Sequence, residues 1–217
     1  MKKYAFPVIS LVFILLAGSA RQVVADEVTK WNETATRIAN ESGLSGNPLF
    51  GLLNLAMADG YISTFETRYH YNYWRPITAI REAETDGNPM TSADPAWTPL
   101  VDTPPIPDYD SGHSVEGGVA AQVLKRFFGT DFISFNACSA TLPAGSNCQD
   151  ASPVRRSYSS FSAAADENGL SRILVGFHFR KAVTAGIERG RRIGNRAVND
   201  FLRPVHWRQD VAGEEQH

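Results

Sequence analysis

Residues 47–76, NPLFGLLNLAMADGYISTFETRYHYNYWRP, read as one long helix that leads into an arginine-proline pair. Asn47 suits the capping position and Pro48 the first helical position, where a missing N–H is tolerated. Apolar side chains recur at the spacing of a helix face that packs on a core, namely Leu49, Leu52, Leu53, Ala56, Ile62 and Phe65. Because a residue before proline avoids the helical conformation, we expect this helix to end or kink near Trp74.

Further helical patterns lie on both sides of a proline-rich loop. A short helical piece reaches about Glu84, and residues 89–110 then carry too many prolines for a helix or a central strand. A helix capped by Ser111 follows and ends at Gly129. Later patterns predict a short helix over 157–169 with an Asn-Gly stop, another capped by Ser171, and a long helix over 179–202.

No alternating strand pattern of any length and no internal repeat is present. The sequence therefore predicts an all-α helical bundle with a long, ordered, proline-rich loop. The length suits a single domain with a real core.

The first 25 residues have the pattern of a bacterial-type secretory signal peptide, with two lysines, a short apolar stretch and small residues up to Ala25. We therefore assign 1–25 as the leader and 26–217 as the mature domain, secreted or periplasmic. Loss of Lys2, Lys3 and Arg21 shifts the formal net charge from −2 to about −5, which disfavours nucleic acid and anionic membranes as partners. No later apolar run is long enough to predict a membrane span.

The two cysteines, Cys138 and Cys148, lie in one loop rich in small residues. In an exported chain this arrangement predicts a local disulfide rather than a metal site or a catalytic thiol.

The first candidate motif is Arg68 with Arg75-Pro76. Seven residues are two helical turns, so both guanidinium groups could leave one helix face and converge on one anion. Arg81 has a less suitable spacing. Taken alone, the pattern also fits two surface arginines and a helix-ending proline.

The second motif, Ser111-Gly112-His113, stands where the proline-rich loop enters a helix. A helix start offers unpaired N–H groups, glycine lets a ligand approach the backbone, and His113 could exchange a proton with what is bound. Taken alone, it also fits an ordinary serine cap beside an exposed histidine.

The third motif is Ser171-Arg172 with Gly176-Phe177-His178. Six residues of continuous helix would turn Arg172 and His178 to different faces, so we expect Gly176 to break the helix and bring His178 round. Taken alone, it also fits a capped helix with a core histidine.

Together, the three motifs describe a pocket for a small oxyanion, since an arginine fork binds two oxygens and keeps its charge. They resemble the three signature segments of the type 2 phosphatidic acid phosphatase and vanadium-dependent haloperoxidase superfamily. The segments YHYNYWRPITAIR (69–81), DPAWTPLVDTPPIPDYDSGHS (94–114) and GLSRILVGFHFR (169–180) look like its bacterial haloperoxidase-related branch. The resemblance covers about residues 48–203.

The resemblance implies a role for each motif residue. Arg68, Arg75 and Arg172, with Ser111 and the Gly112 N–H, would bind the oxygens of vanadate or phosphate. His178 would be the axial vanadium ligand, or in a phosphatase the nucleophile that forms a phosphohistidine. His113 would be the acid-base partner.

Two positions depart from the family pattern. The pattern has lysine where this chain has Arg68, which puts peroxide activation in question but not oxyanion binding. It also has aspartate four residues after the last histidine, where this chain has Ala182. His178 or Arg172 would then need another orienting partner, for which a backbone carbonyl or Glu188 are candidates.

Three functions follow. The first is a vanadate-dependent haloperoxidase that uses hydrogen peroxide to oxidise halide. The second is an acid phosphatase acting on phosphate esters, and the third is a non-catalytic oxyanion binder. The family enzymes are longer, so we hypothesise that a second copy covers apolar faces of this chain. The aromatic side chains of Tyr71, Tyr73, Trp74 and Phe177 are expected to serve core packing rather than substrate binding.

Overall fold

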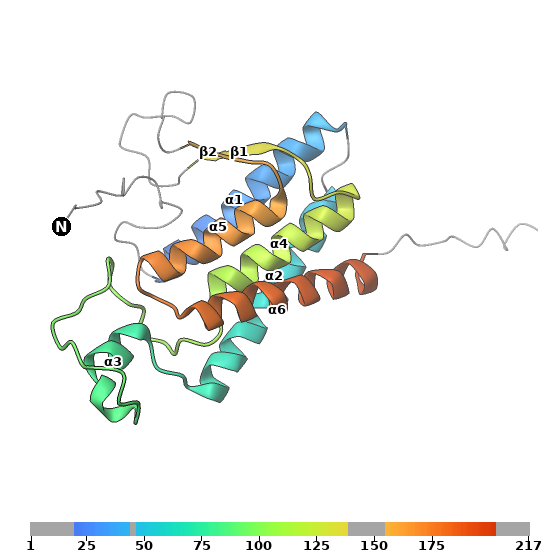
Figure 1. Cartoon of the computed structure of the whole chain (residues 1–217). Helices are drawn as coiled ribbons and strands as arrows, with labels where there is room; N and C mark the ends of the chain where they lie inside the picture. The colour runs from blue at the N-terminus through green and yellow to red at the C-terminus, as the bar shows by residue number, and fades with distance from the viewer. Residues whose placement is uncertain (1–19, 44–46, 139–154, 203–217) are drawn as a thin grey trace, which may run out of the picture.

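The computed structural model describes residues 20–43, 47–138 and 155–202 (Figure 1). The helices are α1 (Ala20–Glu41), α2 (Asn47–Tyr71), α3 (Pro76–Arg81), α4 (Gly112–Phe128), α5 (Phe161–Leu174) and α6 (Arg180–Asp200). The 3-10 turn η1 (Ala83–Thr85) follows α3, and strands β1 (Phe135–Cys138) and β2 (Arg155–Tyr158) pair antiparallel, Phe135 opposite Tyr158. The expected all-α bundle is confirmed, with this small sheet added. None of the helices in the described ranges is long and apolar enough to cross a membrane.

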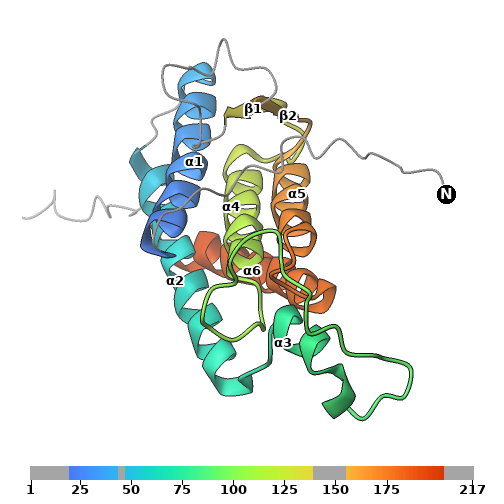
Figure 2. The same ribbon diagram turned by 90° about the vertical axis from the view of Figure 1, so that its left-hand side faces the viewer.

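Helix α4 is the centre of the bundle, in contact with α1, α2, α5 and α6 (Figure 2). Its side chains Val115, Val119, Val123 and Leu124 are fully buried. The small sheet lies at one end of the bundle, whereas α3 and the proline-rich loop lie at the other (Figures 1 and 2). The first turn of α4 faces this second end, where the three sequence motifs meet.

Helix α6 lies close to α4 because a row of small residues faces it. A Cβ atom on Gly186 would lie 2.8 Å from Ser111 O, and one on Gly190 would overlap the backbone of Val115. Gly194 is equally tight against Val119 O at 2.9 Å. The four-residue spacing of these glycines keeps them on one face of α6, so the two backbones can approach closely.

The buried face of α2 becomes polar in the second half of the helix. Leu49, Leu53 and Ala56 are buried as expected, but Ile62 and Phe65 are 66% and 42% exposed, so their placement in the core was wrong. The inward positions there belong to Thr64, Thr67 and Arg68, which are at most 6% exposed. Hydrophobic periodicity fails here because this part of α2 faces the polar end of the bundle rather than the apolar core.

Helix α5 is continuous, and the predicted Asn-Gly stop and Ser171 cap are both wrong. The helix is capped instead by Ser160, whose side chain accepts from the Ala163 N–H at 3.0 Å. Gly169 stays in the helix, where a Cβ atom would lie 2.9 Å from Val183 Cγ1. This glycine serves helix packing rather than a turn.

Helix α1 and the small sheet were not predicted. In α1, Trp31, Ala35, Ile38 and Ala39 are buried at helical spacing, so the pattern was present but consisted largely of alanine. Each strand is four residues long, which is too short for alternation to stand out. The predicted disulfide partner Cys148 lies outside the described residues, and the disulfide, the leader peptide and the homo-oligomer stay predictions.

Candidate oxyanion site

The two arginines of the first motif converge, but not from one helix face. Helix α2 ends at Tyr71, and Asn72 then takes a positive φ of 45°. Arg68 lies in the last turn of α2, whereas Arg75 is the extended residue before α3. Because Pro76 opens α3, the chain turns between them, and the expectation of two turns of a single helix was wrong.

Backbone carbonyls of the proline-rich loop hold both guanidinium groups. Arg68 Nε donates to Asp110 O at 2.9 Å, and Arg75 Nε donates to Ile106 O at 2.7 Å. Arg75 Nη1 also donates to Phe177 O at 3.0 Å. Both arginines are about 95% buried, so the loop that separates the first two motifs in sequence fixes the charged groups in space.

The second motif forms the start of α4, as predicted. Ser111 occupies the capping position but does not cap with its side chain, because its Oγ accepts from Ser114 Oγ at 2.9 Å. The Ser111 N–H donates to Ala182 O at 3.1 Å, which ties the motif to α6. A Cβ atom on Gly112 would lie 3.3 Å from Arg68 Nη2, so glycine allows the first motif to approach the second.

The third motif is broken at Gly176, as predicted. Helix α5 ends at Leu174, and Gly176 has φ +84°. The N–H of His178 donates back to Arg172 O at 3.3 Å. A Cβ atom on Gly176 would lie 2.9 Å from Trp97, so the proline-rich loop packs against this turn. Arg172 and His178 are both buried at the same end of the bundle.

Asp108 is the orienting partner of His178, and the sequence analysis did not identify it. His178 Nδ1 lies 2.6 Å from Asp108 Oδ1, and Asp108 is 1% exposed. The Asp108 N–H donates to Tyr73 O at 2.8 Å, which fixes the loop. The alternative partner Glu188 is exposed. Its one sequence signal is a carboxylate three residues before the Ser-Gly-His motif, which does not identify His178 as its partner.

The contacts of His178 assign its tautomer. Arg75 Nη1 lies 3.1 Å from Nε2 and 3.4 Å from Nδ1, so this contact alone does not assign the proton. With Asp108 ionised, its carboxylate accepts from Nδ1 at 2.6 Å, which places the proton on Nδ1 and leaves Nε2 with its lone pair. The imidazole is held neutral with an available lone pair among the arginines.

The charges of the site converge on the two histidines. Burial and then Arg75, Arg68 and Arg172 lower the pKa of His178 well below its usual value. Burial and the same three arginines lower the pKa of His113. Both histidines are therefore neutral at pH 7, and all three motifs contribute to one electrostatic site.

Two carboxylates compensate only part of the buried positive charge. Burial raises the pKa of Asp108 to about 7, although Arg75 opposes this. Asp110 is fully buried, and its Oδ2 lies 2.6 Å from Arg189 Nε. Arg189 is partly exposed, so the buried arginines are Arg68, Arg75 and Arg172, and they outnumber these two aspartates even when both are ionised. Buried charge of one sign is costly without a counter-charge, so the site suits an anion.

The remaining sequence candidates lie outside this cluster. Arg81 Nε donates to Trp97 O at 2.9 Å and supports the loop. Phe177 is buried with the Arg172 guanidinium over its ring, as expected for core packing. Tyr71 and Tyr73 are 60% and 51% exposed, so core packing was wrong for both. The ring of Tyr71 makes an edge contact with Tyr109, and the ring of Tyr73 makes one with Phe179. Tyr109 precedes the second motif in the chain, and Phe179 follows the third.

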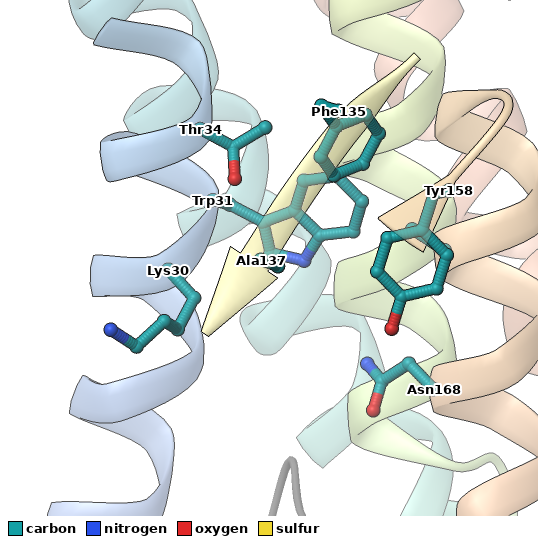
Figure 3. Close-up of a pocket in the computed structure, with 8 residues that line it drawn as sticks. Lys30, Trp31, Thr34, Phe135, Ala137, Tyr158 and Asn168 are labelled. Atoms are coloured by element: carbon teal, nitrogen blue, oxygen red, sulfur yellow. The ribbon is translucent and has the colours of Figure 1, made fainter. Parts of the chain in front are cut away.

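A separate, small hollow of about 20 Å³ lies between α1, the sheet and α5 (Figure 3). The rings of Trp31, Phe135 and Tyr158 line it, with Asn168 below them (Figure 3). Lys30 at its edge is paired with Glu33 at 2.8 Å, so this mainly apolar hollow has no charge to offer an anion. The candidate oxyanion site is therefore the convergent cluster at the other end of α4, where the three motifs meet.

Comparison with known proteins agrees with this geometry. The chain is 28% identical over 184 residues to the vanadium chloroperoxidase of Curvularia inaequalis, which covers 76% of this chain and 28% of that protein. A bacterial vanadium-dependent iodoperoxidase structure matches with a TM-score of 0.65 and 34% identity over 80% of this chain and 38% of its own. A bacterial vanadium-dependent chloroperoxidase in its holo form has a TM-score of 0.63 and 20% identity over 80% of this chain and 40% of its own, which shows a shared fold.

The chain thus spans well under half the length of these relatives. A family model described as the VCPO second helical-bundle domain matches residues 48–206, a range that begins with α2 and includes all three motifs and Asp108. The helical bundle and the convergence of these segments at one end of α4 agree with that match, and the chain belongs to the family of the VCPO second helical-bundle domain.

Proposed function

We propose that this protein is an enzyme of the vanadium haloperoxidase type that binds vanadate at the oxyanion site and oxidises halide with hydrogen peroxide. The observation that carries the proposal is the neutral His178, whose Nδ1 is bound to Asp108 and whose Nε2 keeps its lone pair within a cluster of buried arginines. An oxyanion whose central atom accepts a nitrogen ligand would satisfy both features at once.

The residues present fit vanadate. His178 Nε2 would be the nitrogen ligand, and Arg68, Arg75 and Arg172 would bind the oxygens. Ser111 and the N–H of Gly112 at the start of α4 would add hydrogen bonds. Vanadate, when bound, supplies the electrophilic centre for the oxidation of halide by peroxide.

His113 would handle protons. Its Nε2 is buried and has no hydrogen-bond partner among the described residues. Its lowered pKa keeps the ring neutral at pH 7, so it can accept a proton from hydrogen peroxide and later return it. Its place beside Gly112 puts it next to the groups that would hold the anion.

An acid phosphatase is the second candidate, and the Asp108–His178 pair favours it. A carboxylate that holds Nδ1–H leaves Nε2 as a nucleophile, which could attack a phosphate ester and form a phosphohistidine. The arginine cluster would stabilise the phosphoryl group during transfer. The absence of an aspartate at Ala182 would favour a non-catalytic anion binder, but Asp108 supplies the carboxylate that this position lacks.

One pair of assays separates these functions. Purified protein is incubated with orthovanadate, and bromide, chloride and iodide oxidation by hydrogen peroxide is followed, alongside hydrolysis of p-nitrophenyl phosphate without vanadate. We expect halide oxidation that depends on added vanadate. Phosphate ester hydrolysis alone would select the phosphatase, and anion binding without turnover would select the binder. We also propose export, which the N-terminus of the protein secreted by its host would test.

A further inference from the structure

Thr64 carries a buried hydroxyl that no neighbour satisfies. The residue is 1% exposed, and Oγ1 has no hydrogen-bond partner in the described part of the chain. Other helical threonines bond back to the preceding turn: Thr67 Oγ1 donates to Ser63 O at 2.7 Å, and Thr36 Oγ1 to Asn32 O at 2.7 Å. Since a buried hydroxyl normally has a partner, Thr64 requires an explanation.

The position of Thr64 connects it to the oxyanion site. It lies one helical turn before Arg68 on the inward face of α2. Thr64 Cγ2 and Arg68 Nη2 lie 3.7 Å and 3.3 Å from the place where a Cβ atom on Gly112 would be. The side chain therefore stands beside the first turn of α4, whose N–H groups have no acceptor within the helix.

A second unsatisfied polar atom belongs to the residue after that glycine. His113 Nε2 is buried without a partner among the described residues. Thr64 and His113 come from different helices: Thr64 Cγ2 lies beside the Gly112 position, and His113 follows Gly112 in the chain. Two buried polar atoms without partners, on residues that flank one glycine and a guanidinium group, indicate a place for a polar guest.

We infer that Thr64 is a further anion-binding residue, whose hydroxyl donates a hydrogen bond to an oxygen of the bound oxyanion beside Arg68. This inference rests on the proposed function, because it uses the same site. The chemistry is that of a tetrahedral oxyanion and holds for vanadate and phosphate alike.

The test compares Thr64→Val, Thr64→Ser and the control Thr67→Val in the full-length protein. Binding of orthovanadate and of inorganic phosphate is measured by isothermal titration calorimetry. A hydrogen bond to a charged acceptor corresponds to roughly 10- to 150-fold in affinity, so we expect Thr64→Val to weaken binding of both anions by about 10-fold or more. Thr64→Ser keeps the hydroxyl and should bind as the wild type does, as should Thr67→Val.

Thermal melting without anion gives an independent readout. Removal of an unsatisfied hydroxyl by an isosteric methyl is neutral or stabilising, so Thr64→Val should melt at or above the wild-type temperature. Thr67→Val loses a formed hydrogen bond and should melt lower. In Thr64→Val the upward shift of melting temperature by phosphate should shrink.

Unchanged affinity of Thr64→Val for both anions would overturn the inference and leave the proposed function intact. An equal loss in Thr67→Val would also overturn it, since the effect would then not depend on the site. Wild-type protein that binds neither anion would overturn the proposed function itself.

Discussion

Replacement of Asp108 by asparagine should weaken vanadate binding while it stabilises the protein. The carboxylate accepts the Nδ1–H of His178 at 2.6 Å and is also bonded to the backbone N–H of Phe179. An amide has one acceptor atom in place of two and no charge. Hydrogen bonds to charged groups contribute about 1.5–3 kcal/mol, so vanadate affinity should fall roughly 10- to 150-fold as the charge-assisted bond that orients His178 is lost.

The sign of this effect separates orientation from simple electrostatics. Asp108 is a negative charge 3.9 Å from Arg75 Nη1, next to the site of an anion. If charge alone mattered, its removal would tighten the binding of any anion. Weaker vanadate binding in Asp108→Asn can therefore come only from the lost control of His178. An affinity that is unchanged or higher would refute the reasoning.

The stability effect has a defined pH window. Burial raises the pKa of Asp108 from 3.8 to about 7, and this difference corresponds to about 4 kcal/mol. For an acid whose pKa is raised by folding, stability is greatest below the unfolded pKa and falls as pH rises through the folded pKa. Relative to Asp108→Asn, the wild type should lose stability between about pH 4 and pH 7 and then stay level.

Calorimetric melting at pH 4, 6 and 8 measures this window. Asp108→Asn should melt roughly 8–16 °C above the wild type at pH 8 and close to it at pH 4. The exposed pair Asp166–Arg191 provides a matched control, because Asp166→Asn removes a carboxylate at the surface. That variant should change the melting temperature little at any pH.

The other predictions concern the histidines, pH and helix packing. His178→Ala and His113→Ala should each abolish most turnover in whichever assay the wild type passes; substantial residual turnover would show that the assigned roles are wrong. Vanadate affinity should fall as pH drops through about 7, because a protonated Asp108 donates to Nδ1 and the imidazole proton then moves to Nε2. This fall in affinity should be missing in Asp108→Asn, so that variant controls for the titration of vanadate itself. Gly190→Ala should destabilise the fold by several kcal/mol in chemical denaturation, because its Cβ would overlap the backbone of Val115. The control Gly87→Ala has open space around it but a φ of +74°, so it should destabilise the fold by only about 1 kcal/mol.

The sequence predicted which segments meet better than the path of the chain through them. Ser111 and Gly176 were placed correctly because each stands at a helix end, where cap and glycine signals are strong. Arg75 was correctly placed before a proline break but wrongly placed on one helix face with Arg68. Ile62 and Gly169 were misread because the role of each depends on the element that it faces. Ile62 points outward because α2 turns its polar side to the site at that point. Gly169 stays within α5 and allows close contact with α6.

Asp108 could not be assigned from local pattern for a similar reason. Asp108 is an aspartate in a loop, seventy residues before His178 in the sequence. Only the tertiary structure brings the two residues into contact. The burial of Asp108 follows from the hydrogen bond to Tyr73 and from the packing of Trp97 against Gly176. Sequence spacing carries no information about such contacts, whereas the helix-end signals are local.

The packing of α6 explains why the carboxylate of this site stands on the loop. Ala182 is 1% exposed, and its carbonyl accepts the Ser111 N–H. It begins the four-residue series that continues through Gly186, Gly190 and Gly194, where even a Cβ atom would be too large. A bulkier charged residue at 182 would have to fit at the start of this close contact between α4 and α6. A loop aspartate orients His178 without widening that contact. Ala182 thus keeps α4 and α6 close together, while Asp108 supplies the carboxylate.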